Sequence, residues 1–548
     1  MRWAWEPQCH FRMLGQSVRE CIVAVFGPVP YRHFHVRGGT TRLSRGVLQV
    51  ISRNILSQWG LYALNAVMLL AITPLLVHGL GDDAFGVWVI TGNAIAWLMV
   101  MDFGIGSAVL RFGALILKQD KGVSGELQAL FNSALFMFMV IGGLAIGIAL
   151  LLGGLIPDRF FAAALTRGAF VDFSLILGLA LALNFWGQAF SAMLQAYQRF
   201  DLVNMIKVIG LLLRIILYGW LMMHGYGLLG LASATLASTL VSTAVLLIVS
   251  RVTVRWRISL GSFSSSWVSR LFGYGGLMLV IVIADQVRFA LDSVIVAAYL
   301  SLALVTVYGI GAALTTVFRE VVGALVPVFV PLFSEEQANG ASPRFLLATR
   351  LFSLAVWGFG LLLIVVADPF IRLWMGDYGQ SAHVAYVLIA GFLVASSQSL
   401  SFSLMYGQAR HLPVAVISVI DALANLGLSL WLVRGYGVIG VSLGTSIPFL
   451  FTYGILFPVI VSRSLSIPLY AYVREALLIP GGFALLVLAL AVLAGNVWRP
   501  VGWPELILSG LLIVGGYALL AWFSVVGGDG RLFLRKLIQD RALRGEAE

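Results

Sequence analysis

Residues 84–100, AFGVWVITGNAIAWLMV, are almost entirely apolar, and MDFGIGSAVLRF, residues 101–112, follows them at once. A helix rises 1.5 Å per residue, so a run of about twenty such residues crosses the roughly 30 Å of a bilayer's hydrocarbon core. Asp102 and Arg111 then mark where the helix leaves the membrane. Gly104 and Gly106 would allow close helix approach, and Arg111 could reach lipid phosphates.

Apolar runs of this length recur along the chain between about residues 56 and 526. The 548 residues are 60% hydrophobic and only 11% charged, with a mean hydropathy of +0.97. Barrel strands would instead be about ten residues long with alternating polarity. The sequence therefore predicts an all-α polytopic membrane protein with about fourteen transmembrane helices.

The net charge of +11 follows the expected topology rather than a nucleic-acid partner. With the N-terminus placed inside, most of the 35 Lys and Arg fall in cytoplasmic segments, as the positive-inside rule requires. Both termini are then cytoplasmic. Anionic membrane lipids are expected partners of two basic segments. The first segment joins the sixth and seventh spans and carries Arg251, Arg255, Arg257 and Arg270. The second lies near the C-terminus and carries Arg531, Arg535, Lys536, Arg541 and Arg544.

An internal repeat divides the chain. GYGLLGLASATLAS at residues 225–238 recurs as GYGVIGVSLGTSIP at residues 435–448, in the same place between two spans. Because each half holds an even number of spans, the two lobes should be related by an axis along the membrane normal. The predicted units are a disordered, basic cytoplasmic tail (1–50), an N-lobe of six spans (51–250), a cytoplasmic interfacial linker (251–272), a C-lobe of six spans (273–462), two extra spans (463–527) and a basic cytoplasmic tail (528–548).

Several motifs suggest chemistry that their context does not support. Both repeat copies match the dinucleotide pattern G-x-G-x-x-G, but that fingerprint needs a strand before it, so the glycines are expected to form tight turns. Asp82 and Asp83 could be a metal-binding pair, yet a solvated turn is the favoured interpretation. Cys9 and Cys21 lie in the reducing cytosolic tail, and the histidines show no metal-ligand spacing. We therefore expect no resident cofactor and no metal.

Charged residues inside the spans are the functional candidates, because each costs about 2.5–3.5 kcal/mol to insert at mid-helix. Asp285, Arg288 and Asp292 lie in the seventh span, Arg214 in the fifth, and Asp421 in the eleventh, one turn from Asn425. At 100° per residue the three charges of the seventh span share one face. That face should line a cavity or a helix contact; the alternative is a closed salt-bridge cluster that only locks the bundle.

MDFGIGSAVLRF, preceded by LGDDAFGVW at residues 80–88, resembles the signature of the polysaccharide transporters, the O-antigen and exopolysaccharide flippases of the multidrug/oligosaccharidyl-lipid/polysaccharide flippase superfamily. PVFVPLFSEEQANGASPRF, residues 327–345, resembles the same family's stretch at the end of the eighth span. The resemblance covers roughly residues 50–525. It implies a membrane transporter of the bacterial inner membrane rather than an enzyme.

On this resemblance, the substrate would be a lipid-linked oligosaccharide of the undecaprenyl-diphosphate type, moved by alternating access of the two lobes. Its lipid tail would lie against the last two spans, and polysaccharide polymerase and other export machinery are expected partners. A cation-coupled multidrug exporter of the same superfamily is the alternative, followed by a membrane polysaccharide polymerase or ligase. An exporter usually stops at twelve spans and favours acidic cavities, and a polymerase or ligase carries a long outer loop.

The resemblance also suggests where the working residues lie. The seventh span would border the central cavity, where H⁺ or Na⁺ coupling is expected. The candidate residues are Arg288, Asp285, Asp292 and Arg214 for the substrate cavity, Asp102, Gly104, Gly106 and Arg111 for the inner gate, and Asp285, Asp292 and Asp421 for coupling.

Overall fold

The computed structural model describes residues 45–119, 125–162, 164–254, 256–274, 276–329, 343–408, 410–495 and 500–526. All regular secondary structure within these ranges is helical, which confirms the predicted fold class. Residues 1–44, the predicted tail 528–548 and most of the stretch after Phe329 lie outside the described residues. Residues 45–50, predicted to belong to a disordered tail, are instead helical and begin α2 Arg45–Leu80. The N-lobe, linker and C-lobe boundaries stay predictions.

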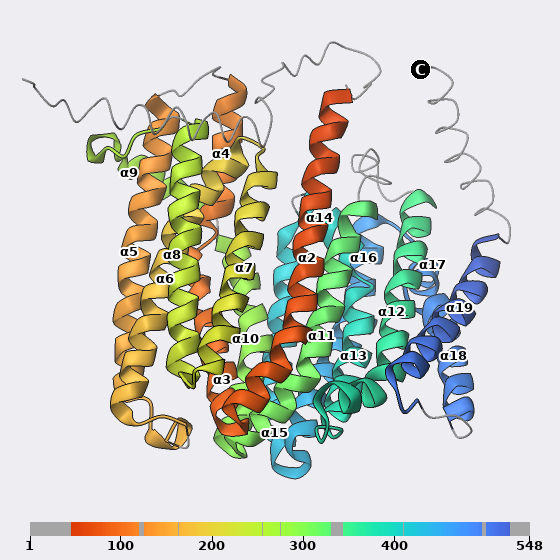
Figure 1. Cartoon of the computed structure of the whole chain (residues 1–548). Helices are drawn as coiled ribbons and strands as arrows, with labels where there is room; N and C mark the ends of the chain where they lie inside the picture. Colours follow the sequence, from red (N-terminus) through yellow and green to blue (C-terminus); the bar gives the residue numbers. More distant parts are fainter. Residues whose placement is uncertain are drawn as a thin grey trace, which may run out of the picture.

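The first half of the chain builds one bundle. Its helices are α2 Arg45–Leu80, α3 Asp82–Met99, η1 Val100–Asp102, α4 Ile105–Gln119, α5 Gly125–Leu155, η2 Asp158–Phe160, α6 Arg167–Ala196, α7 Phe200–Met223 and α8 Gly227–Val254. Helix α6 packs against α4, α5 and α8, and α7 packs against α8 and α2 (Figure 1). The connection to the second half contains η3 Leu260–Ser262 and α9 Ser265–Tyr274, which contacts α4 and α5.

The second half builds a second bundle around α15. Its helices are α10 Gly276–Tyr299, α11 Leu302–Phe329, α12 Pro343–Met375, α13 Ser381–Ser396, α14 Ser399–Gly407, α15 His411–Phe451, η6 Thr452–Leu456, α16 Phe457–Leu465, α17 Leu469–Val473, η7 Arg474–Leu478, α18 Ile479–Gly495 and α19 Trp503–Val526. Helix α15 packs against α10 and α13, and α11 packs against α13 and α12. Helices α18 and α19 lie on the outer side of α12 (Figure 1).

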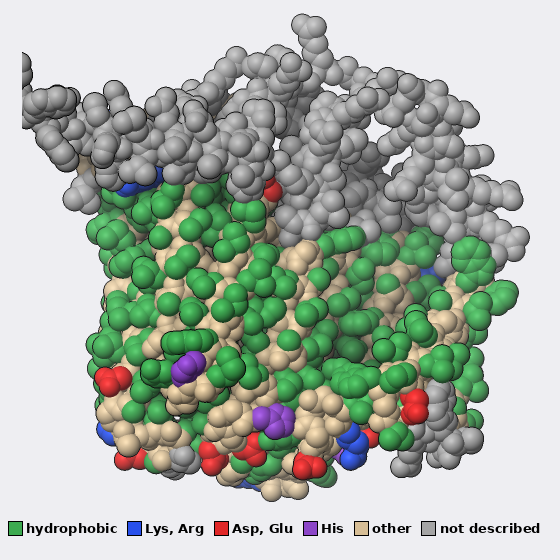
Figure 2. Space-filling model, in the orientation of Figure 1, with side chains coloured by type: hydrophobic (Ala, Val, Ile, Leu, Met, Phe, Trp, Pro, Cys, Tyr) green, Lys and Arg blue, Asp and Glu red, His purple; other side chains and the backbone are tan. Residues whose placement is uncertain are grey.

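The two bundles meet along α2 and α3 of the first half and α10 and α11 of the second. Apolar side chains fill this contact, and one continuous cluster includes Leu76, Val77 and Phe85 together with Ile310 and Leu314. In Figure 2, hydrophobic side chains cover the sides of the molecule, and charged side chains are visible toward both ends, with histidines toward the end opposite α9. This distribution is that of a multi-pass membrane protein.

The predicted number of spans is not settled by helix length. Ten described helical segments are long and apolar enough to cross a membrane, or eleven if the bent pair α13 and α14 is one span. The segment His411–Leu465 has 55 residues, far more than the roughly 20 that one crossing needs. It is broken at Gly437, whose φ of 57° is left-handed. Fourteen crossings would require this segment to cross twice and α7, α10 and the bent pair to cross once each.

The repeated glycine motifs form turns, as the sequence predicts. Gly225 and Gly227 have φ values of 76° and 53°, and Gly437 in the second copy has the corresponding left-handed conformation. Glycine adopts positive φ without the steric cost that a side chain would add. The motifs therefore reverse the chain at the end opposite α9, and the dinucleotide interpretation has no structural support among the described residues.

Candidate functional site: a polar cavity in the second bundle

The helices of the second bundle line an open cavity of about 400 Å³. Three charged side chains line it, Asp285 and Arg288 on α10 and Arg319 on α11. The remaining lining is mainly aromatic and serine-rich: Phe289, Phe392, Phe402, Phe449, Tyr406 and Tyr453, with Ser396, Ser399, Ser403 and Ser418. Cavities of this size with an apolar lining and a few polar groups are typical of small-molecule and substrate sites.

Arg288 is held by four groups. Its Nε lies 2.5 Å from Asp421 Oδ2 on α15, and its Nη1 donates to Asp285 Oδ1 at 2.9 Å. Its Nη2 donates to the Tyr453 hydroxyl at 3.1 Å and to the Ser418 carbonyl oxygen at 3.5 Å. Arg288 is 5% exposed and Asp421 fully buried, so the guanidinium is a buried cation already paired with two carboxylates.

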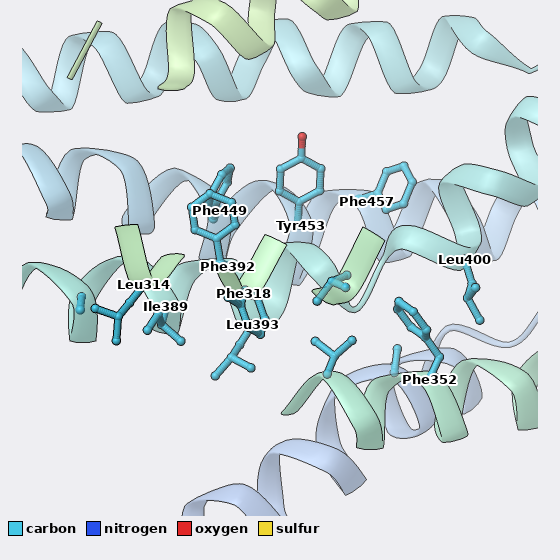
Figure 3. Packing of buried hydrophobic residues seen from close by; sticks show 14 of the residues in the cluster. Leu314, Phe318, Phe352, Ile389, Phe392, Leu393, Leu400, Phe449, Tyr453 and Phe457 are labelled. Carbon is cyan, nitrogen blue, oxygen red and sulfur yellow. The ribbon is translucent and has the colours of Figure 1, made fainter. Parts of the chain in front are cut away.

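A short π-helix supplies two of the side chains around this ion pair. In η6, the Thr452 hydroxyl donates to Asp421 Oδ1 at 2.7 Å, while Tyr453 accepts from Arg288. Figure 3 shows Phe449, Tyr453 and Phe457 in one row, with the Tyr453 hydroxyl pointing away from the apolar side chains beneath it. Insertions of this kind in α-helices often occur at functional sites because they redirect side chains locally.

Of the two arginines that line the cavity, Arg319 differs from Arg288 in its partners, which are aromatic rings. Its Cζ lies 4.0 Å from the centre of the Phe289 ring and 5.7 Å from that of Phe392, and its side chain is exposed to the cavity. Within the described ranges, no carboxylate forms an ion pair with it. Aromatic faces hold a guanidinium by cation–π attraction without satisfying its hydrogen-bond donors. Arg319 can therefore bind an anionic group that enters the cavity.

The break between α13 and α14 presents serines to the cavity. The two helices meet at a bend of 40°, and Ser396, Ser399 and Ser403 line the cavity around it. The opposite side of the break is anchored, because Trp357 Nε1 donates to Ser397 Oγ at 2.9 Å and the Tyr472 hydroxyl donates to Gln398 Oε1. Broken helices in transporters commonly line binding sites in this way.

Asp292 does not join the Arg288 cluster, although the helical spacing suggested one shared face. It is 1% exposed, and its Oδ2 accepts hydrogen bonds from the Tyr308 hydroxyl at 2.6 Å and from Thr445 Oγ1 at 2.8 Å. Asn425 Nδ2 donates to the same threonine at 2.9 Å. Oδ1 of Asp292 and Oδ1 of Asn425 have no hydrogen-bond partner among the described residues. The structure thus separates the predicted cluster into an arginine centre and a second, buried carboxylate centre.

Arg214 lies apart from both centres, in the first bundle. Its Nε donates to Ser238 Oγ at 3.0 Å and its Nη2 to Thr239 Oγ1 at 3.3 Å, both on α8. Lys207 stands two helical turns earlier on the same side of α7. The expectation that Arg214 shares one cavity with Arg288 is not supported for the cavity described above, which only second-bundle residues line.

The motif around Asp102 is a capped helix break. Phe103 and Gly104 have left-handed φ values of 49° and 73°, and Asp102 Oδ1 accepts the Gly106 N–H at 3.2 Å at the start of α4. The expected close helix approach at Gly106 is wrong, because within 4 Å a Cβ there would meet only the two carboxylate oxygens of Asp102, at 3.7 and 3.9 Å. Arg111 is exposed on α4. Phe103 contacts Phe272 of α9 at 5.6 Å, so the break touches the connection between the bundles.

Sequence reasoning missed several residues of these centres. Arg319 carries a charge inside a span and could have been found by the rule that identified Arg288. Tyr308, Thr445 and Tyr453 could not, because hydroxyl-bearing residues are common in the chain and only the fold brings these three to Asp292 and Arg288. The ion pair of Arg350 with Glu475, which joins α12 to the π-helix η7, was also missed.

Comparisons with known proteins agree with this architecture. The chain is 24% identical over 407 residues to a putative O-antigen transporter of Shigella flexneri, covering 71% of this chain and 93% of the relative. It is 22% identical over 500 residues to the uncharacterized membrane protein EpsK of Bacillus subtilis (strain 168), covering 87% and 95%.

Two solved structures show the same fold. The lipid II flippase MurJ in an inward closed conformation matches with a TM-score of 0.67 at 15% identity, covering 87% of this chain and all of that one. An inward-facing multidrug resistance transporter of the MATE family matches with a TM-score of 0.61 at 15% identity, covering 75% and 98%. The family model described as polysaccharide biosynthesis protein matches residues 80–382, which is more than half of the chain. The chain therefore belongs to the polysaccharide biosynthesis protein family.

Proposed function

We propose that this protein is a flippase that moves a lipid-linked oligosaccharide of the undecaprenyl-diphosphate type across the bacterial inner membrane. The observation that carries the proposal is the cavity that combines Arg319 with serines and aromatic rings. Guanidinium groups bind phosphates and sugar carboxylates, hydroxyl groups bond to sugars, and aromatic faces pack on sugar rings. The lobes would alternate access to this cavity, and the lipid tail would stay in hydrocarbon beside α18 and α19.

The role we propose for Arg288 differs from the one expected. Arg288 is neutralised by Asp421 and Asp285, so in our proposal it shapes the cavity wall and orients Tyr453. Arg319 attracts the anionic part of the substrate. A drug exporter that carries cations would instead be expected to leave a carboxylate unpaired at this place, whereas Asp285 is bonded to Arg288.

Arg319→Gln should lower transport at least tenfold while the protein still inserts and folds, because the side chain contacts rings but no buried carboxylate. Arg319→Lys should retain more activity, since the positive charge survives. The measurement is display of the surface glycan in a deletion strain, at matched membrane levels of each variant. Arg372→Gln is the control, because this exposed arginine near the end of α12 pairs with Asp368 and lines no part of the cavity described above.

Two further results decide the function itself. A deletion strain without redundant flippases should accumulate lipid-linked oligosaccharide in the cytoplasmic leaflet while its synthesis continues. Full glycan display in that strain, or in cells that carry Arg319→Gln, would contradict the proposal. Altered drug resistance with normal glycan display would favour the exporter.

For coupling we propose the Asp292 centre. It offers two buried oxygens without partners, from Asp292 and Asn425, next to the hydroxyls of Tyr308 and Thr445. Oxygen ligands of this kind suit Na⁺, and the carboxylate alone suits H⁺. Asp292→Asn should abolish the dependence of flipping on the ion gradient in proteoliposomes, while Asp368→Asn at the exposed end of α12 should leave it unchanged. An unchanged ion dependence in Asp292→Asn would exclude this centre.

A further inference from the structure

The two bundles are joined by polar contacts at the end opposite α9, which the distribution of Lys and Arg predicts to be the outer end. Thr306 Oγ1 on α11 donates to the backbone oxygen of Asp82 at 2.7 Å, and the Tyr378 hydroxyl donates to the Asp82 carboxylate. Trp374 Nε1 on α12 donates to the Leu70 carbonyl oxygen of α2 at 2.6 Å. Asp82 is thus no solvated turn residue, because the second bundle binds it twice.

The Leu70 carbonyl is available because of Pro74. In an α-helix the carbonyl of residue i accepts from the N–H of residue i+4, which for Leu70 is residue 74. Proline has no N–H, so Pro74 leaves this carbonyl without its intrahelical donor. The Trp374 indole from the other bundle takes that place. An unpaired carbonyl away from water is costly, so the proline makes α2 dependent on a donor from α12 at this point.

The backbones also meet closely beside these hydrogen bonds. A Cβ on Gly86 of α3 would lie 2.5 Å from the Leu302 carbonyl oxygen at the start of α11, so no larger residue fits without a shift. Leu302 is 8% exposed and packs in a cluster whose other buried members all belong to the first bundle. Leu302 would become accessible if the two bundles separated at this end.

We propose that Leu70, Asp82, Thr306, Trp374 and Tyr378 form an outer latch that holds the bundles together at this end, and that Pro74 belongs to it by supplying the acceptor. Every acceptor of the latch lies on the first bundle and every donor on the second. Burial and the bond to Asp82 raise the pKa of Tyr378, in the loop after α12, to about 12, so this donor keeps its proton at physiological pH. In the proposed function, on which the latch's role rests, the contacts must break whenever the cavity opens outward.

The latch can be tested without any transport substrate. Cys9 and Cys21 are the only cysteines of the chain and are replaced by Ser; Leu302→Cys then serves as the probe. The measured quantity is the rate at which a membrane-impermeant maleimide labels position 302 in purified protein. Ser301→Cys, at an exposed position, gives the reference rate.

Trp374→Phe removes the indole N–H together with the pyrrole part of the ring and should raise the labelling rate about two- to tenfold, the range expected for one lost hydrogen bond. Pro74→Ala gives residue 74 an N–H that can donate to the Leu70 carbonyl within α2. This variant should raise the labelling rate by a similar factor. Because both changes act on one hydrogen bond, the double variant should label no faster than the faster single variant. Trp357→Phe is the matched control, since its indole bonds to Ser397 within the second bundle and should leave the rate unchanged.

Labelling at the parent rate in both Trp374→Phe and Tyr378→Phe would overturn the latch. If the fold-changes in labelling rate of Trp374→Phe and Pro74→Ala multiplied in the double variant, Pro74 would act independently of the Trp374 hydrogen bond. That result would overturn the assignment of Pro74 to the latch. If a cavity variant such as Arg319→Gln lost transport in cells while labelling at position 302 kept the parent rate, the latch would stand. Such a result concerns the proposed function alone.

Discussion

Arg288 illustrates how a buried charge can stabilise a membrane bundle. The guanidinium joins α10 to α15 through Asp421, and both side chains are withdrawn from solvent. Buried pairs often add little compared with well-packed apolar residues, because desolvation offsets the attraction between the charges. Removal of one partner is different, since it leaves the other charge buried without compensation. The network around Arg288 should therefore respond strongly to single changes and weakly to matched double changes.

Arg288→Gln should lower the free energy of unfolding by about 3–5 kcal/mol, because Asp421 keeps its charge in an apolar surrounding. Arg288→Gln combined with Asp421→Asn should recover much of this loss, since two neutral amides can bond to each other. Denaturant unfolding in detergent measures both. Arg372→Gln breaks an exposed pair and should lower the free energy of unfolding far less, because solvent screens the two charges. An equal loss in Arg288→Gln and Arg372→Gln would show that the buried pair is not structural.

The sequence predicted which charged residues form polar centres inside the bundle, but it did not predict which residues they pair with. Arg288, Asp285, Asp292 and Asp421 were identified because charge inside an apolar span is costly. Three of them are buried, and Asp285 lines the cavity beside Arg288. Their partners depend on which helix packs on α10, and that information is not local. Periodicity places Asp285 and Asp292 on one face, yet α15 supplies Asp421 to the arginine and Thr445 to Asp292.

Among the helices, α15 shows how glycine lets two arms pack closely. The chain reverses at Gly437, and the second arm then returns along the first. A Cβ on Gly444 would lie 2.2 Å from Ser429 Oγ and 2.6 Å from Ser429 Cα, whereas a Cβ on Gly427 would meet no atom within 4 Å. The apolar runs on either side of residue 435 predict both arms, but their contact residues become evident only in the structure.

Gly444→Val should therefore separate the arms and destabilise the protein by at least about 1–3 kcal/mol, the usual cost of overpacking. Gly427→Val, on the same helix, should change stability by less than about 1 kcal/mol, because its side chain enters open space. Thermal unfolding in detergent separates the two variants. If both behaved alike, the close contact of the arms at Ser429 would be in doubt.

For the whole molecule, hydropathy alone predicts the all-α membrane fold, because the backbone must satisfy its own hydrogen bonds in lipid. The repeat predicts two similar halves, and its glycines reverse the chain in both copies. The number of crossings is harder to predict. The charges in α7 and α10 lower the hydropathy of these helices, and the 55-residue segment His411–Leu465 is long enough for two crossings although its helices are continuous. Hydropathy cannot show that a helix break such as the one after α13 lines a polar cavity inside one bundle.

The orientation of the molecule is a prediction that the distribution of charge makes and labelling can test. Described basic residues such as Lys118, Arg251 and Arg270 lie toward the end that carries α9, so this end should face the cytoplasm. In the cysteine-free protein, Ser301→Cys at the opposite end should react with an impermeant maleimide in intact spheroplasts. Ser266→Cys on α9 is also exposed, but should react only after permeabilisation. The reverse pattern would invert the topology and place the latch of Asp82 and Trp374 on the cytoplasmic side, where it would control substrate entry instead of release.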